Sequence, residues 1–348
     1  MSLGVGIIGT GGISRAHAKG YQQQAGKARI VAVADIDEER ARKAAAEWGA
    51  QHVFTDYRHL LELRDVDAVS VCTYNQAHCL PTVAALEAGK HVLVEKPMAA
   101  NAADAWRMVR ASRASGRMLM VEMKWRFMPE LQAARQAVVS GQVGQAYYAE
   151  AIGWQRRGIP GGSFIRQDTA GGGALMDNGV YTLDAVLYML GHPRPLTVSG
   201  TARTVFGRGP GGGWSPDEFS VEDTGTAYVR LEGGITVFFA HAWAIDFPDQ
   251  WQMRVAGSAG SVEVYPFSPT KLRIMQGGYA DLQEATPAEL PEGSIDVPYA
   301  VARFVDAVLD GRPSPVPADT FLYTNVIFDG LYESSRLGRE VPVSLPGD

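Results

Sequence analysis

Residues 1–122 consist of short apolar runs that alternate with helical patterns. The runs are apolar enough to be strands buried on both faces of a sheet, and they read LGVGIIG, ARIVAVAD, DAVSVC, HVLVE and RMLMVE. Gly49, Gly89 and Gly116 stand where the intervening helices should end. This alternation predicts a doubly wound parallel sheet.

After Glu122 the pattern changes. A helical segment at residues 130–140 precedes the strand AYYAEAIGW, and six further strand candidates follow from Leu196 onward without long helices between them. Such a run predicts a mostly antiparallel sheet, and helical patterns at residues 299–309 and 319–337 close the chain. We therefore expect an α/β protein with two domains, residues 1–122 and 123–348, the second of α+β type. The Gly/Pro-rich segment 206–220 predicts an exposed, mobile connection, with a lid as the alternative.

Composition narrows the function. The 348 residues carry a net charge of −6 and contain two cysteines, Cys72 and Cys79. An acidic chain argues against nucleic-acid binding, no apolar run is long enough to span a membrane, and two cysteines indicate neither a disulfide framework nor a metal site. We expect a cytoplasmic protein without a bound metal.

A glycine-rich loop follows the first predicted strand. In GTGGIS, Gly9, Gly11 and Gly12 precede Ile13 and a helix that can begin at Ser14. Such a loop lets backbone N–H groups approach a dinucleotide pyrophosphate. Asp35, at the end of the second strand, can accept hydrogen bonds from the ribose and repel a 2′-phosphate, which favours NAD over NADP. A helix N-cap is the alternative role for Asp35.

The ends of two later strands carry further candidates. Glu95 ends the apolar run HVLVE, and Lys96 and a proline follow it; ligands of such sheets bind beyond the carboxyl ends of the strands. The alternative for Lys96 is a solvated strand end. The segment TYNQAH can contact the nicotinamide half of the cofactor through Thr73, Asn75 and His78, although such a histidine more often packs or caps.

The segment GGGALMDNGVYTLD runs from three glycines into a predicted helix. Asp177, Tyr181, Asp184 and Tyr188 fall at helical spacing on one face, while the other faces are apolar. The helix should therefore be buried, and its polar stripe is either part of an active site or a structural seam between domains.

Taken together, the glycine loop, VEKPMA and GGGALMDNGVYTLD resemble the glucose–fructose oxidoreductase/inositol dehydrogenase (Gfo/Idh/MocA) family. The resemblance implies a Rossmann domain, a C-terminal domain with an open, mostly antiparallel sheet that often mediates oligomerisation, and NAD(P)-linked chemistry on sugars or polyols. We accordingly expect a homo-oligomer, a dimer or tetramer.

The resemblance also assigns roles. Lys96 matches the lysine that touches cofactor and substrate, and Asp177 begins a D-x-x-x-H pair whose histidine is replaced here by Tyr181. Removing the proton of an alcohol needs a general base, and an ammonium near a phenol lowers its pKa from about 10. The hypothesis is that Lys96 and Tyr181 transfer the proton while Asp177 orients the substrate or the lysine.

Substrate contacts are expected from a segment rich in arginine and aromatic residues, together with one arginine before it; these candidates are Arg126, Trp154, Arg157, Phe164 and Arg166. Two other functions remain open: an NAD-dependent glycosidase that uses transient oxidation, and a non-catalytic NAD-binding sensor.

Overall fold

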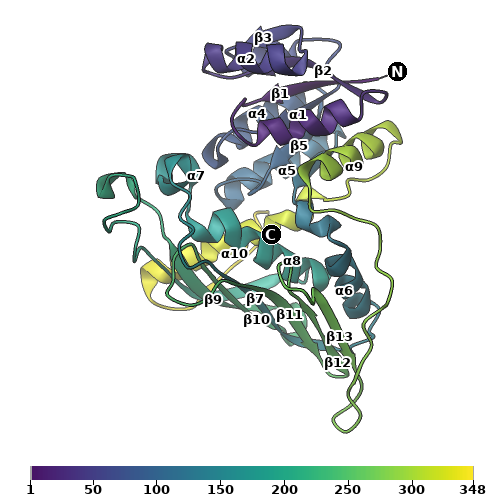
Figure 1. Cartoon of the computed structure of the whole chain (residues 1–348), viewed down its shortest axis with the longest axis vertical. Coiled ribbons are helices and arrows are strands. Elements are labelled where there is room, and N and C mark those ends of the chain that lie inside the picture. The colour runs from purple at the N-terminus through teal and green to yellow at the C-terminus, as the bar shows by residue number, and fades with distance from the viewer. Residues whose placement is uncertain (1, 348) are drawn as a thin grey trace. The chain divides into compact units, whose positions relative to one another are not determined.

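The computed structural model describes residues 2–347, and the chain divides into two compact units (Figure 1). The first unit contains the chain up to Lys124 together with Ser294–Leu322, and the second contains Trp125–Gly293 and the chain from Tyr323 onward.

The first unit is built on a six-stranded sheet with the order β3-β2-β1-β4-β5-β6, and all of its strand pairs are parallel. This is the order of the dinucleotide-binding Rossmann fold, so the predicted doubly wound parallel sheet is confirmed. The elements are β1 Leu3–Ile8, α1 Ser14–Gln23, β2 Ala28–Ala34, α2 Glu38–Trp48, β3 His52–Phe54, α3 Tyr57–Leu61, β4 Ala68–Val71, α4 Cys79–Glu87, β5 His91–Glu95, α5 Ala102–Ser115, β6 Leu119–Glu122 and α9 Val297–Leu309.

Strand order reverses between β1 and β4, which are neighbours in this sheet. Ligands of such sheets bind outside the carboxyl ends of the strands, at the reversal. The loops that follow β1 and β4 begin at Gly9 and Cys72, so the predicted cofactor residues lie at this edge of the sheet.

Helix α9 packs against α1 within the first unit. Gly20 makes the close approach possible, because a Cβ atom at this position would lie 2.7 Å from Cβ of Val301. Lys27 Nζ also pairs with Asp306 Oδ1 at 2.6 Å. By its contacts, the segment Ser294–Leu322 thus belongs with the residues up to Lys124, whereas the sequence expectation placed all of 123–348 in one domain.

The second unit is built on a nine-stranded sheet with the order β14-β13-β12-β11-β7-β10-β9-β8-β15. Only the central β7–β10 pair is parallel among its described strand pairs, so the expected mostly antiparallel sheet is confirmed. The elements are α6 Pro129–Val139, β7 Ala146–Trp154, α7 Gln167–Ala170, η4 Leu175–Gly179, α8 Val180–Met189, β8 Pro195–Arg203, β9 Thr224–Leu231, β10 Thr236–Ala242, β11 Gln250–Gly257, β12 Gly260–Val264, β13 Leu272–Gln276, β14 Gln283–Glu284, the part of α10 Ala318–Leu337 from Tyr323 onward, and β15 Val341–Pro342.

The segment 206–220 makes more contacts with the rest of its unit than its Gly/Pro-rich composition predicts. Its tip is exposed, but Phe219 is buried in an apolar cluster with Ile165, Val221 and Trp243, against which Trp214 packs. The carboxylate of Asp223 accepts hydrogen bonds from successive backbone N–H groups of residues 205–207. The base of the segment is therefore fixed to the second unit.

None of the helices within residues 2–347 is long and apolar enough to cross a lipid bilayer.

Candidate active site

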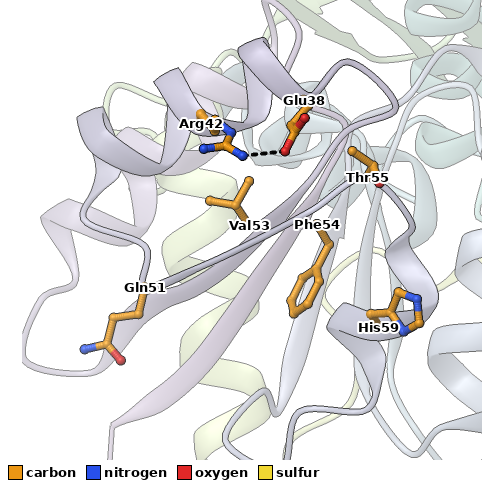
Figure 2. Close-up of a pocket in the computed structure, with 7 residues that line it drawn as sticks. All are labelled: Glu38, Arg42, Gln51, Val53, Phe54, Thr55 and His59. Carbon is orange, nitrogen blue, oxygen red and sulfur yellow. Dashed lines mark hydrogen bonds and ion pairs between the residues drawn. The ribbon is translucent and has the colours of Figure 1, made fainter.

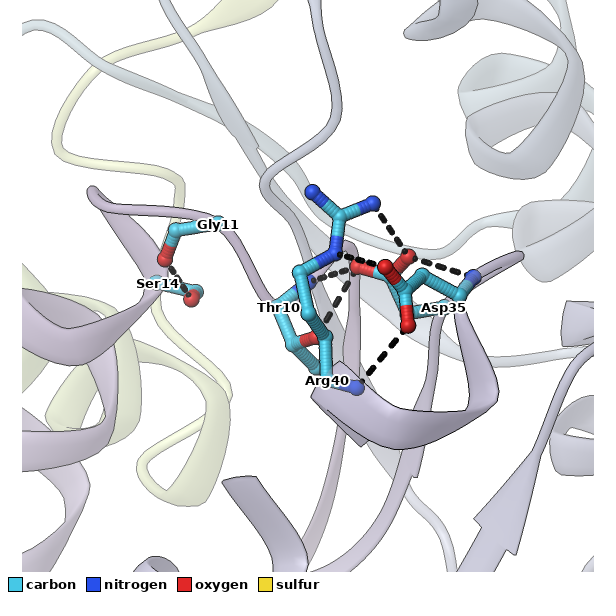
Figure 3. Close-up of polar contacts among 6 residues, drawn as sticks. Thr10, Gly11, Ser14, Asp35 and Arg40 are labelled. Atoms are coloured by element: carbon cyan, nitrogen blue, oxygen red, sulfur yellow. Dashed lines mark hydrogen bonds and ion pairs between the residues drawn. The ribbon is translucent and has the colours of Figure 1, made fainter. Parts of the chain in front are cut away.

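The glycine loop after β1 has the geometry that a dinucleotide requires. Gly9 adopts φ +88°, and a Cβ there would lie 2.8 Å from the carbonyl of Cys72. At Gly11 and Gly12 an added Cβ would meet nothing within 4 Å, so the surface above them is open. Ser14 begins α1 and its hydroxyl donates to the carbonyl of Gly11 at 2.6 Å (Figure 3). The loop can accept a pyrophosphate at the N-terminus of α1, with Ile13 partly exposed beside it.

Asp35 lies directly after β2 and faces this loop (Figure 3). Its Oδ2 accepts hydrogen bonds from the backbone N–H and the hydroxyl of Thr10, at 2.7 and 2.8 Å. Burial raises the pKa of Asp35, but hydrogen bonds from Asp37 and Thr10 and the charge of Arg40 outweigh it and hold the pKa below its ordinary value. Asp37 caps α2, so the alternative N-cap role for Asp35 is wrong.

Lys96 follows β5, and the Lys96–Pro97 peptide is cis. The preceding residue, Glu95, is buried: its Oε1 lies 2.8 Å from Nε2 of His17, and its Oε2 accepts the N–H of Lys96 at 3.1 Å. His17 is fully buried and also contacts the hydroxyl of Ser70. The main chain at Lys96 is thus held by a carboxylate whose partner His17 links α1 to β4.

A second buried carboxylate, Glu122, lies beside Glu95 in the neighbouring strand β6. Its Oε1 has no hydrogen-bond partner among the described residues. Burial and the nearby charge of Glu95 raise the pKa of Glu122 well above its ordinary value. Burial also raises the pKa of Glu95, but the hydrogen bond and charge of His17 hold it below its usual range. Of the two carboxylates, the environment thus favours the charged form of Glu95 and the neutral form of Glu122.

His78 joins the ends of two strands. Its Nδ1 lies 2.8 Å from the carbonyl oxygen of Pro97, and its Nε2 lies 3.0 Å from that of Thr73. Burial lowers the pKa of His78, and a neutral imidazole donates one hydrogen bond at a time. The ring holds the Thr73 and Lys96–Pro97 turns together, which is a packing role. Asn75 begins the short 3-10 helix Asn75–Ala77, which lies between Thr73 and His78 in the sequence.

The helix that carries Asp177 and Tyr181 does not start as an α-helix. Residues Leu175–Gly179 form a π-helical turn, and α8 begins at Val180. Asp177 is buried and its Oδ2 accepts a hydrogen bond from the indole N–H of Trp243 at 3.2 Å. Tyr181 is half-buried, and its ring centroid lies 5.0 Å from that of Trp125.

The lower half of the predicted stripe is structural. Asp184 is fully buried and forms an ion pair with Arg126, with N–O distances of 2.6 and 2.9 Å. The guanidinium of Arg135 lies 4.5 Å from the ring centroid of Tyr188. Asp184 and Tyr188 thus bind neighbouring arginines, and only Asp177 and Tyr181 remain as candidates for chemistry.

Two of the three glycines before this helix closely approach protein atoms. A Cβ at Gly173 would lie 1.9 Å from the carbonyl oxygen of Glu222, and one at Gly172 would lie 2.3 Å from the hydroxyl of Tyr332. The Glu222 carboxylate accepts the N–H groups of Gly173 and Leu175, at 2.8 and 3.0 Å, and the Tyr332 hydroxyl at 3.0 Å. Glu222 therefore fixes the start of the helix, a role that no local pattern signalled.

The expected substrate residues are dispersed in the second unit. Trp154 ends β7 and its ring packs edge-on against Phe247. Arg157 pairs with Asp246 at 2.6 Å, Arg166 is exposed near Asp168, and Phe164 is exposed. Arg126 is buried in its ion pair. A substrate contact by any of them stays a prediction.

A shallow hollow of about 390 Å³ lies at the β3 edge of the first sheet (Figure 2). Its lining includes Phe54, His59 and the ion pair between Arg42 and Glu38. No group of three or more His, Cys, Asp or Glu side chains within residues 2–347 could hold a metal ion.

The sheet order, the glycine loop and Asp35 define a dinucleotide-binding protein of the Rossmann class. The family described as "Oxidoreductase family, NAD-binding Rossmann fold" matches residues 3–123, and the "GFO/IDH/MocA C-terminal domain" matches residues 131–263. The chain belongs to the Gfo/Idh/MocA family, which confirms the predicted family, the enzyme class and NAD as the cofactor.

Proteins that are similar along almost the whole chain agree with this family assignment. The D-glucoside 3-dehydrogenase of Escherichia coli is 32% identical over 97% of each chain. Among solved structures, an oxidoreductase domain protein from Kribbella flavida has a TM-score of 0.87 at 25% identity, covering 99% of this chain and 100% of that one. The aldose-aldose oxidoreductase of Caulobacter crescentus has a TM-score of 0.81 at 27% identity, covering 98% of this chain and 100% of that one.

Proposed function

We propose that this protein is an NAD-dependent dehydrogenase or reductase that interconverts a hydroxyl and a carbonyl group on a sugar or polyol. The observation that carries the proposal is the similarity along almost the whole chain to a D-glucoside 3-dehydrogenase. The aldose-aldose oxidoreductase, whose structure is similar along almost the whole chain, is also named for a sugar.

In the proposed mechanism Lys96 and Tyr181 transfer the proton and Asp177 orients the substrate or the lysine. When bound, NAD accepts the hydride from the carbinol carbon or returns it as NADH. Removal of the hydroxyl proton as the hydride leaves contributes ~10² to 10⁴ to the rate. In this proposal Tyr181 supplies the basic oxygen, since an ammonium brought close to a phenol favours the phenolate form. In the reducing direction the same groups return the proton to the forming alkoxide.

The surroundings of each group support these roles. The buried contacts of Glu95 hold the Lys96 main chain, Trp125 packs against the ring of Tyr181, and Trp243 binds the carboxylate of Asp177. Asp35, with its lowered pKa, is an anion at neutral pH and favours NAD over NADP.

The test is a panel of glucosides, free aldoses and polyols monitored by NADH absorbance, followed by two variants on the best substrate. Tyr181→Phe and Lys96→Ala should each lower kcat by ~10² or more while NAD still binds. Wild-type turnover by Tyr181→Phe would remove the tyrosine from the mechanism. Net cleavage of a glycoside without net NADH would instead identify a glycosidase, and NAD binding without turnover of any compound would identify a sensor.

We further propose that the chain forms a homo-oligomer through the open face of the second sheet. Tyr228 of β9 and Phe238 of β10 are paired in register, their ring centroids lie 5.2 Å apart, and Tyr228 is 57% exposed. Aromatic side chains on an exposed sheet face are typical of a buried interface core. Light scattering after size exclusion should give a dimer or tetramer, and Tyr228→Lys should reduce the mass towards that of the monomer.

A further inference from the structure

Four aromatic side chains of the second unit form a continuous cluster that includes Tyr181. The ring centroid of Trp125 lies 5.0 Å from that of Tyr181 and 6.2 Å from that of Phe267. Trp251 of β11 completes the cluster, because its ring meets those of Trp125 and Phe267 edge-on, at 5.8 and 5.6 Å. The proposed base and Phe267 therefore contact the same indole ring.

The members of this cluster differ in burial. Trp125 is 4% exposed, and Tyr181 and Trp251 are partly buried, whereas Phe267 is 64% exposed. Single exposed apolar side chains are common on protein surfaces. Phe267 differs from such a side chain because it is the exposed end of a group of rings that reaches a proposed catalytic residue.

The exposed ring of Phe267 is held in place. It lies in the turn between β12 and β13, directly after Pro266, whose φ is fixed by its own ring. The turn is closed by hydrogen bonds from the N–H of Tyr265 to the carbonyl of Lys271 at 2.8 Å and from the N–H of Ser268 to the carbonyl of Tyr265 at 3.1 Å. A ligand that packs on a ring fixed in this way loses little affinity to ordering of the protein.

We propose that Phe267 binds the aglycone of a glycoside whose sugar ring lies at Tyr181, and that this aglycone is aromatic. Because Trp125 separates the two residues, a single sugar ring at Tyr181 leaves Phe267 uncovered, whereas a group attached to that sugar reaches it. Aromatic groups attract one another edge-on or offset-stacked with centroids about 4.5–7 Å apart, and small-molecule sites are lined by such side chains. The inference rests on the proposed function and narrows its substrate class to glycosides.

Tyr279 provides a matched control. It lies on the next turn of the same sheet, between β13 and β14, and its side chain is fully exposed. Tyr279→Ala therefore removes an aromatic group of similar size without changing the cluster. Phe267→Ala removes the proposed contact, and Phe267→Tyr restores an aromatic ring at the same position.

The experiment measures NADH formation from glucose, from methyl and phenyl glucosides in both anomeric forms, and from cellobiose. The wild type should have a kcat/KM about tenfold higher for a phenyl glucoside than for the matching methyl glucoside. Phe267→Ala should abolish this preference by raising KM for the phenyl glucoside with kcat unchanged, because the lost contact is made equally in the ground and transition states. Phe267→Tyr should keep the preference, and Tyr279→Ala should match the wild type.

A rise in KM confined to the phenyl glucoside is the decisive result. Equal changes for the methyl and phenyl glucosides, or a larger change for cellobiose than for the phenyl glucoside, would overturn the assignment of an aromatic aglycone while the proposed function stands. A lower mass of Phe267→Ala in light scattering would place the ring in an interface between copies, which also overturns it. If the wild type oxidises free aldoses or polyols but no glucoside, the inference is wrong and the proposed function survives; turnover of no compound removes both.

Discussion

The indole N–H of Trp243 donates a hydrogen bond to the carboxylate of Asp177 across 3.2 Å, although the two residues are 66 positions apart in the sequence. Both side chains are buried. Trp243, which directly follows strand β10, therefore orients the carboxylate of Asp177. It is a positioning residue for the group that we propose orients the substrate or the lysine.

Trp243→Phe keeps a large aromatic ring and removes the donor. We expect kcat to fall about tenfold, because a carboxylate that loses a buried donor changes its orientation, at a cost of about 1–3 kcal/mol. NAD affinity should not change. Trp214→Phe is the control, because Trp214 packs against the same apolar cluster but donates to Gly207 instead; equal kcat losses in the two variants would show that packing alone matters.

The glycine loop offers a test that separates binding from folding. Gly12→Ala should fold with an unchanged or slightly higher Tm, because the added methyl meets open space. The same methyl should weaken NAD⁺ binding by about tenfold or more, since a pyrophosphate must approach this backbone closely. Gly9→Ala should instead destabilise the fold by about 1–3 kcal/mol, because of its φ of +88° and the Cys72 carbonyl. Calorimetric unfolding and NAD⁺ titration of both variants distinguish the two effects.

The two buried carboxylates should respond oppositely to amide substitution. The folded protein raises the pKa of Glu122 above its ordinary value of about 4.5. Between the ordinary and the raised pKa, the native state binds more protons than the unfolded state. The free energy of unfolding therefore falls as the pH rises through this window. Glu122→Gln removes this titration and should gain stability relative to the wild type as the pH increases through that window.

Glu95→Gln should show the reverse. The pKa of Glu95 is lowered, so its stabilising contribution is present above about pH 4.5 and is lost in more acidic solution. Replacing the carboxylate that is hydrogen-bonded to buried His17 should cost about 1–3 kcal/mol at neutral pH. Urea unfolding between about pH 3 and pH 8 measures both variants, and parallel curves for the two would contradict the opposite directions of their pKa shifts.

His241 should make the second unit sensitive to acid. The ring is fully buried in β10, and neither nitrogen has a hydrogen-bond partner among the described residues. Burial lowers the pKa of His241 from 6.5 to about 3. The unfolded state therefore binds the extra proton between these values, and stability decreases as the pH falls from 6.5 towards 3. His241→Leu should show a shallower loss of stability over that range in urea unfolding, and an unchanged slope would exclude this histidine as the cause.

Local sequence predicts most of the fold and where several candidate residues lie in it. The glycine loop and Asp35 each lie at the end of a short apolar strand, and the order of such elements is enough to place them at one edge of a parallel sheet. Lys96 is located in the same way. No local pattern predicts a contact with a distant partner: His17 and Glu95 are 78 positions apart, and Glu222 and Gly173 are 49 apart.

Periodicity explains this difference, because it reports which face of an element is buried and not what that face contacts. The spacing on α8 predicts a buried stripe, but it cannot distinguish Asp177, which binds Trp243, from Asp184, which binds Arg126. The π-helical turn at residues 175–179 also leaves no trace in the pattern.

The packing of α9 on α1 bears on how this protein can be recombined with its relatives. A chimera with a single junction at Lys124 would join the α1 of one parent to the α9 of the other and put Gly20 against a foreign side chain in place of Val301. Exchange of the nucleotide-binding unit therefore has to move two gene segments together, the one up to Lys124 and the one for Ser294–Leu322. A single crossover that brought in a new cofactor preference would disturb the packing of α9 on α1.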